Sequence, residues 1–116
     1  MKSFSFPKNE RLLNREDFVN LNRFGKRYRS THFTVIFRHN GLGINRLGIT
    51  VSKKTGNAVV RNRVKRRVRE FFRLHKKDFP QGYEIAVIAN NGAGDLIFRE
   101  IKEELGEIIL DKWLCA

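Results

Sequence analysis

The sequence predicts a single α+β domain in which helices pack on a small mixed β-sheet. Two periodicities support this class. Apolar residues recur at every second position in residues 31–39 and 46–53, and at every third or fourth position in residues 58–77 and 97–108. With 116 residues, 41% of them hydrophobic, the chain is long enough for one compact domain, residues 1–116, with its own core. We expect residues 1–10 to form a flexible arm.

The expected order of elements is helix, strand, strand, helix, strand, helix. Asn14, followed by acidic residues, predicts the start of the first helix, and Gly25 predicts its end. The two alternating segments predict half-buried strands. Residues 40–43 between them have the composition of a turn, so we expect the two strands to pair as a hairpin. Strict alternation assigns the following side chains to the core: Phe33, Val35, Phe37, Leu47, Ile49 and Val51.

The second half of the chain predicts a long helix, a buried strand and a last helix. Asn57 is a suitable cap for a helix over residues 58–77, which must stop before Pro80. Residues 83–89 are almost continuously apolar, which is typical of a buried strand. Asp95 is expected to cap the last helix. The apolar stripe of that helix is Ile97, Ile101, Leu105 and Ile108.

Charge is the strongest compositional signal. The chain has 24 Lys and Arg against 12 Asp and Glu, a net charge of +12 and a pI near 10.6. No acidic residue lies between Asp17 and Glu70, whereas acidic residues outnumber basic ones from Asp78 onward. Charge that is segregated in this way predicts a polyanionic partner.

Several protein classes are excluded by composition. No apolar run approaches the roughly 18 residues that a transmembrane helix needs, and the first residues lack the apolar stretch of a secretory signal. No segment has a free apolar face beside its basic face, so nucleic acid is favoured over a membrane surface. The single cysteine, Cys115, excludes an internal disulfide and a cysteine-based zinc site. We expect a cytoplasmic nucleic-acid-binding protein.

The segment 57–69 is the first candidate binding surface. On a helix, Val60, Val64, Val68 and Phe71 form a narrow apolar stripe, and Arg63 and Arg67 lie near it, so that their guanidinium groups reach outward. The opposite side and its flank carry Arg61, Asn62, Lys65, Arg66, Arg69 and Arg73. A solvated charged face normally has interleaved acidic residues, and almost none occur here. The pattern therefore favours phosphate contact over a merely solvated face.

The second candidate is the face of the two strands that points away from the core. It carries hydroxyl groups, one aliphatic side chain and cations, which suit a groove that follows a single strand of nucleic acid. Its members are Thr34, Ile36, Arg38, Thr50, Ser52 and Lys54. Phe18, on the first helix, either adds a stacking surface or packs.

Catalytic constellations are absent from the sequence. His32, His39 and His75 are scattered, and none has an evident Asp or Glu partner. The acidic residues of the last helix have the spacing of a solvated face rather than of a Mg²⁺ site. A nuclease that uses two histidines is therefore not suggested, although it stays an alternative.

Residues 52–66 resemble the signature of the bacterial ribonuclease P protein subunit. The hallmark is Arg61-Asn62-Arg63, followed by an apolar residue and Lys65-Arg66. Supporting matches are Glu16-Asp17-Phe18, Gly25 and Arg46-Leu47-Gly48-Ile49. The resemblance extends from about residue 11 to about residue 89.

The resemblance implies an α/β sandwich related to a ribosomal-protein fold, with a left-handed βαβ crossover around the basic helix. It also implies assembly with a catalytic RNA and Mg²⁺-dependent endonucleolytic removal of the 5′ leader from precursor tRNA. The RNA subunit is expected to hold the catalytic Mg²⁺, with none bound tightly by the protein alone. By the same resemblance, the isolated protein is expected to be inactive, and neither a membrane nor a further protein partner is required.

Matching positions carry two sets of expected site residues. The RNA-binding helix contributes Arg61, Asn62, Arg63, Lys65, Arg66 and Arg69. The leader-binding cleft contributes Phe18, Ile36, Thr50, Ser52 and Lys54. The family often has an aromatic residue where Asn22 and Ile36 stand, so leader stacking is expected to be weaker here or to come from Phe24 or Tyr28. Two other hypotheses are a ribosomal or general RNA-binding protein and an autonomous nuclease that uses His32 or His39.

Overall fold

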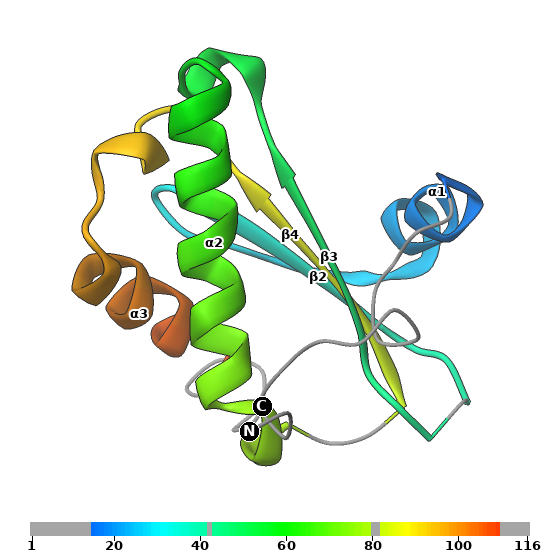
Figure 1. The fold of residues 1–116 in the computed structure, drawn as a ribbon. Helices are drawn as coiled ribbons and strands as arrows, with labels where there is room; N and C mark the ends of the chain where they lie inside the picture. The colour runs from blue at the N-terminus through cyan, green and yellow to red at the C-terminus, as the bar shows by residue number, and fades with distance from the viewer. Residues whose placement is uncertain (1–14, 42, 80–81, 110–116) are drawn as a thin grey trace.

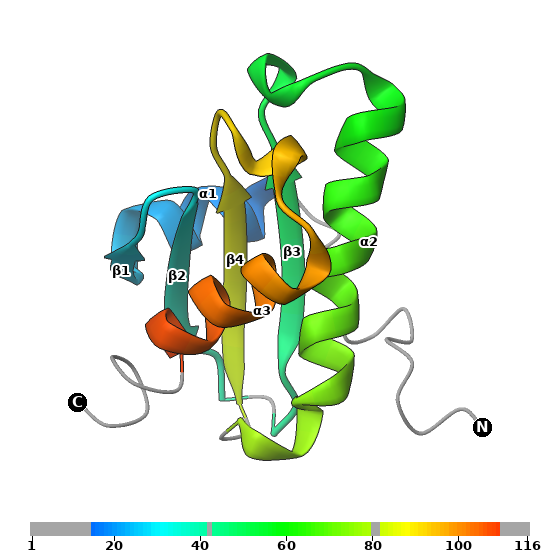
Figure 2. The ribbon, with the colours of Figure 1, turned by 90° about the vertical axis from the view of Figure 1, so that its left-hand side faces the viewer.

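The computed structural model describes residues 15–41, 43–79 and 82–109, and it describes no side chain for residues 15–18 and 22. The expected arm (residues 1–10), the Asn14 cap and Cys115 lie outside the described residues. Three layers are evident in Figures 1 and 2: helix α1 (Arg15–Phe24) covers one face of a β-sheet, and helices α2 (Ala58–Leu74) and α3 (Phe98–Gly106) cover the other. Among the described residues, no helix is both long and apolar enough to cross a membrane.

The sheet has four strands in the order β1-β2-β4-β3. The predicted hairpin is wrong, because β4 (Tyr83–Ala89) lies between β2 (Phe33–His39) and β3 (Arg46–Val51). Strand β4 pairs antiparallel with β2 and parallel with β3. It is apolar on both faces, and a strand of that kind is most stable at the centre of a sheet, where both faces are covered. The sheet is mixed, as predicted.

Strand β1 (Lys26–Arg29) is an element that the sequence analysis missed. It pairs antiparallel with β2, with Lys26 opposite Phe37 and Arg29 opposite Thr34. Three of its four residues are basic and exposed, so it shows no apolar alternation. Its pairing is made by backbone groups at the edge of the sheet, where charged side chains are common because they discourage further strand addition.

The long helix α2 connects the two parallel strands. Asn57 caps it as predicted, since its side-chain oxygen accepts a hydrogen bond from the Val60 N–H at 3.0 Å. The helix ends at Leu74, three residues earlier than expected, and a 3₁₀ turn (Lys76–Asp78) follows. Figure 2 views the sheet from the α2 side: β3 and β4 both run upward, and β4 lies to the left of β3. The β3–α2–β4 crossover is therefore left-handed, against the usual preference.

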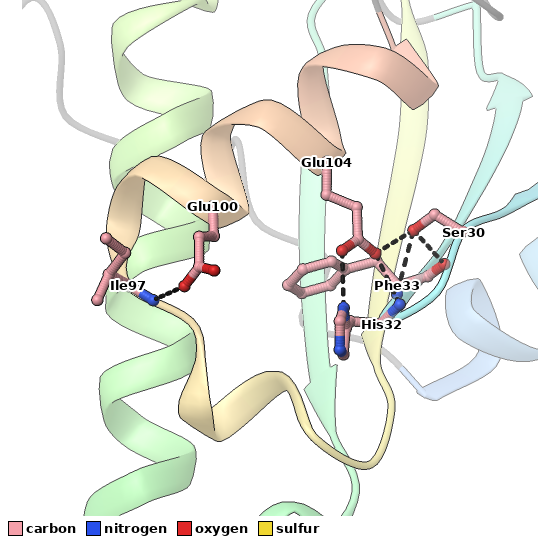
Figure 3. Close-up of polar contacts among 6 residues, drawn as sticks. All are labelled: Ser30, His32, Phe33, Ile97, Glu100 and Glu104. Carbon is pink, nitrogen blue, oxygen red and sulfur yellow. Dashed lines mark hydrogen bonds and ion pairs between the residues drawn. The ribbon is translucent and has the colours of Figure 1, made fainter.

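Helix α3 begins later than predicted. Asp95 does not cap it but ends a 3₁₀ turn, η4 (Ala93–Asp95), and Ile97 occupies the cap position. The Ile97 N–H donates to the Glu100 carboxylate at 3.0 Å (Figure 3), so the helix supplies its own cap. Ile97 is 50% exposed and leaves the predicted stripe, whereas Ile101, Leu105 and Ile108 are fully buried.

The main core lies between the sheet and helices α2 and α3. Of the predicted α2 stripe, Val64, Val68 and Phe71 are buried there, whereas Val60 is partly exposed. A smaller core forms on the other face, where Leu21 of α1 packs on Ile36 and Ala86. Gly25 permits this close approach, because a Cβ atom at that position would meet Ile36 and the Leu21 carbonyl at 2.5 Å.

Candidate RNA-binding surfaces

The outer face of α2 carries a row of polar and cationic side chains. Asn62, Arg66 and Arg69 are exposed, and Arg61 and Lys65 on its flank are half-buried. Spacings of three and four residues place the first three on one side of the helix, opposite the buried valines. Within the described part of the chain, none of these cations forms an ion pair. The row is therefore available for an anionic partner.

Two other arginines of α2 are used inside the fold. The Arg63 guanidinium donates to the Gly94 carbonyl at 3.0 Å, and that of Arg67 donates to the Leu96 carbonyl at 2.5 Å. Both side chains are half-buried and hold the segment between β4 and α3 against α2. This differs from the expectation that their guanidinium groups reach into solvent. The difference arises because residues 94–96 pass close to α2 and present carbonyl groups that need donors.

Three of the five predicted cleft residues come together at the end of β3. Thr50 and Lys54 are exposed, and Ser52 is half-buried between them along the chain. The Ser52 hydroxyl accepts a hydrogen bond from the Lys54 N–H at 3.2 Å, which caps the 3₁₀ turn Lys53–Thr55. The Ser52 hydroxyl thus lies in the turn that carries the exposed Lys54 side chain.

The other two predicted cleft residues stand differently. Ile36 is 1% exposed beneath Leu21 of α1, so the expectation that it faces an open groove is wrong. Helix α1 crosses the sheet at this point and covers the residue, and the neighbouring Thr34 is also buried. Phe18 belongs to α1, but its side chain lies outside the described residues.

The histidines do not converge on a common site. His32 precedes β2 and His39 ends it, which separates them by roughly 23 Å at about 3.3 Å per residue. His39 packs edge-on against Tyr83 with ring centroids 5.4 Å apart. In the described ranges, no group of three or more His, Cys, Asp or Glu side chains could hold a metal ion. The geometry therefore offers no support for the two-histidine nuclease.

Acidic partners of two histidines were missed by the sequence analysis. His75 contacts Asp78 at 2.9 Å, and His32 Nδ1 lies 2.8 Å from Glu104 Oε1. Figure 3 shows that Glu104 reaches from α3 to the turn before β2, where its carboxylate also accepts from the Ser30 hydroxyl and from the His32 N–H at 2.6 Å. The His32 and Glu104 positions are 72 residues apart, so no local pattern could have indicated this contact.

These contacts set the ionisation of Glu104. Partial burial alone would raise the pKa of its carboxyl group, because it disfavours the charged form. The hydrogen bonds from Ser30 and from the ring and backbone of His32, together with attraction to His32, outweigh burial and lower the pKa below its ordinary value of 4.5. Glu104 is thus an ionised anchor between α3 and the β1–β2 turn.

Residues 6–112 match the family model described as ribonuclease P. The chain belongs to the ribonuclease P protein family. Relatives of this family share the sequence along nearly its whole length. The ribonuclease P protein component of Geotalea uraniireducens is 44% identical over 109 residues, which cover 94% of this chain and 96% of that relative. The corresponding protein of Geobacter sp. strain M21 is 46% identical over 106 residues, 90% of each chain.

Solved structures of ribonuclease P proteins have the same fold. The Staphylococcus aureus protein superimposes with a TM-score of 0.84 at 33% identity and covers 92% of this chain and 98% of its own. The Thermotoga maritima protein superimposes with a TM-score of 0.79 at 38% identity and covers 86% of this chain and 94% of its own. These likenesses confirm the predicted α+β fold class and place the basic signature on α2 of a ribonuclease P protein.

Proposed function

We propose that this chain is the protein subunit of ribonuclease P, which binds the catalytic RNA and helps it remove the 5′ leader from precursor tRNA. The observation that carries the proposal is the row of cations on α2 that lack an ion-pair partner within the described residues and coincide with the family signature. The like charges of these cations repel one another, which destabilises the folded protein. A bound polyanion would offset this repulsion and so stabilise the protein.

The outer face of α2 is the proposed contact with the RNA subunit. Arg66 and Arg69 are exposed on the face of α2 that points away from the core, so their guanidinium groups can donate to successive phosphate oxygens. Asn62 extends the same row toward the start of the helix. Arg61, Arg63 and Lys65 belong to the proposed surface as well, with Arg63 also holding Gly94.

The end of β3 is the proposed contact with the leader. Thr50, Ser52 and Lys54 offer hydroxyl groups and one cation, which suit sugar and phosphate contacts with an extended single strand. This surface lies at the end of β3 and in the 3₁₀ turn that leads into α2, whereas Arg66 and Arg69 lie further along the helix. The two RNA ligands would therefore be held by different parts of the protein at the same time.

Catalysis is assigned to the RNA subunit. Hydrolysis of the phosphodiester bond adds water across it, leaving a 5′-phosphate on the tRNA and a hydroxyl group on the released leader. The Mg²⁺ ions that assist this step would be held mainly by the RNA, and the protein would contribute binding energy and position. We expect the complex to work in the cytoplasm with no membrane or further protein partner.

The decisive experiment is reconstitution with a bacterial ribonuclease P RNA at low Mg²⁺ concentration, with and without this protein. We expect cleavage of precursor tRNA only when both components are present, because bound cations replace part of the Mg²⁺ that screens the phosphates. Equal cleavage with and without the protein would contradict the proposal. Sequencing of RNA cross-linked to the protein in cells separates it from a ribosomal role, which predicts rRNA fragments alone.

A protein-based RNA degradation activity is the second candidate. One related Staphylococcus aureus structure is of a mutant with defective mRNA degradation activity. The purified chain, freed of RNA, should be incubated with a single-stranded RNA beside the variant in which His32 and His39 are both alanine. We expect no cleavage by either protein; cleavage by the parent that the double variant loses would support the autonomous nuclease.

A further inference from the structure

Phe24, the last residue of α1, is an exposed aromatic side chain held beside two arginines. It is 61% exposed. The Arg38 guanidinium carbon lies 5.0 Å from the centre of its ring, and that of Arg23 lies 6.0 Å from it. Both distances fall within the range of about 6 Å in which a cation is attracted to an aromatic face. The ring is thus oriented by cations but remains largely open to solvent.

The two arginines carry charge that the fold does not use. Arg38 stands opposite Glu84 in the sheet, yet Glu84 pairs with Arg46 at 3.1 Å from its other side. Within the described part of the chain, neither Arg23 nor Arg38 has a carboxylate partner. Both are exposed. An open aromatic ring beside two such cations is a combination with which proteins hold unpaired nucleotides.

This cluster is separate from the surface at the end of β3. Arg38 and Arg46 both stand opposite Glu84 of the central strand β4, whereas Thr50 stands opposite Ile88 of the same strand. Glu84 and Ile88 are four residues apart along β4, roughly 13 Å at about 3.3 Å per residue. Leu21 of α1 packs between them on Ile36 and Ala86. The two surfaces therefore lie on the same face of the sheet, near opposite ends.

Tyr28, the other aromatic candidate from the sequence, points elsewhere. It stands opposite Val35 in the sheet and packs on Phe37, with ring centroids 5.9 Å apart. Both partners belong to the core beneath α2 and α3. Tyr28 consequently faces away from α1, and Phe24 is left as the aromatic candidate for stacking on the α1 side of the sheet.

We propose that Phe24, Arg23 and Arg38 form a second nucleotide site, in which an unpaired base of the precursor-tRNA leader stacks on Phe24 while the arginines contact its phosphates. The inference rests on the proposed function. The leader is favoured over the RNA subunit because Arg38 shares its sheet face with Thr50, and because helix α1, which ends at Phe24, lies across the sheet from α2 (Figure 2). Stacking also requires a base that is not already paired, which a single-stranded leader supplies.

The test measures the affinity of the reconstituted holoenzyme for precursor tRNAs whose leaders lengthen one nucleotide at a time. With the parent protein, affinity should rise first as the β3 surface fills and again as the leader reaches Phe24. Phe24→Ala should remove only the second rise, a loss of about tenfold for the longest leaders. Phe24→Trp should restore it, whereas Phe24→Leu, which keeps an apolar side chain but no ring, should not. Val19→Ala is the matched control, since Val19 is 51% exposed on the same helix.

The outcomes are distinguishable. Parent-like affinity of Phe24→Ala at every leader length would overturn the site while leaving the β3 surface intact. An equal loss on mature tRNA, or full rescue by Phe24→Leu, would also overturn it, because both indicate packing rather than stacking. A parent protein whose affinity is independent of leader length altogether would instead contradict the proposed function. Thermal unfolding of each variant confirms that the compared proteins are folded.

Discussion

Helices α2 and α3 pack on the same face of the sheet with opposite charges that serve opposite purposes. Two acids of α3 have partners within the protein: Glu104 accepts from Ser30 and His32, and Glu100 accepts from the Ile97 N–H. The exposed cations Arg66 and Arg69 of α2 have no ion-pair partner among the described residues. A charge that the fold satisfies stabilises the fold, whereas a charge left unsatisfied is available to a ligand.

The comparison also divides α2 itself. Arg66 is exposed, but its neighbour Arg67 is half-buried and donates to the Leu96 carbonyl. One step along the helix turns the side chain by about 100°, from the solvent side toward the connection that precedes α3. Replacement of Arg66 should therefore weaken RNA binding, whereas replacement of the adjacent Arg67 should lower the free energy of unfolding.

The largest effect is expected from Arg66→Ala combined with Arg69→Ala. Loss of both guanidinium groups should weaken binding of the RNA subunit roughly 100-fold, or about 2.8 kcal/mol. The slope of log affinity against log salt should fall by nearly two, or about 0.9 for each lost phosphate contact. Filter binding across a salt series measures both quantities. An unchanged slope would contradict direct phosphate contact, and an unchanged melting temperature is the control for folding.

Replacement of Arg67 should produce the opposite pattern. Arg67→Met keeps much of the stem but leaves the Leu96 carbonyl without its donor, which should cost about 2 kcal/mol of the free energy of unfolding. Urea denaturation of the isolated protein measures this loss. The salt slope for RNA binding should stay at the parent value, and a slope lowered as in Arg66→Ala would show that Arg67 also contacts RNA.

Glu104→Gln is expected to have a somewhat smaller effect that depends on pH. At neutral pH the loss of charge-assisted hydrogen bonds should reduce the free energy of unfolding by about 1.5 kcal/mol. The pKa of Glu104 is lowered by folding, so its stabilisation is present above the ordinary value of 4.5 and is lost as pH falls through the folded-state pKa. Unfolding experiments on parent and variant should therefore converge at acidic pH; a difference that persists there would mean that the amide disrupts packing.

Local patterns in the sequence predict the parts of this molecule that depend on neighbours along the chain. The periodicity of Val64, Val68 and Phe71 indicates the buried side of α2, and Asn57 indicates its cap. The signature from 57 to 69 points to the exposed cations in the same way. These features follow from helix geometry, which a short segment determines by itself.

The features that were missed depend on contacts between distant segments. Strand order depends on which strand gains most from a central position, and β4 follows β3 in the chain by a whole helix. Alternation correctly puts Ile36 on the face opposite Phe37, but it cannot show that α1 covers that point. The Arg67–Leu96 and Glu104–His32 contacts join segments 29 and 72 residues apart. Each requires the completed fold.

The smallest effect is expected at the surface proposed for the leader. Lys54→Ala removes one exposed cation and should weaken binding of precursor tRNA about fivefold, or roughly 1 kcal/mol, with little change for mature tRNA. Lys53→Ala is a close control, because Lys53 is exposed in the same 3₁₀ turn. Competition binding of the two tRNAs to the holoenzyme separates the effects. An equal loss of affinity for both tRNAs would mean that Lys54 attracts any RNA through its charge, as the cations of α2 do, and does not contact the leader specifically.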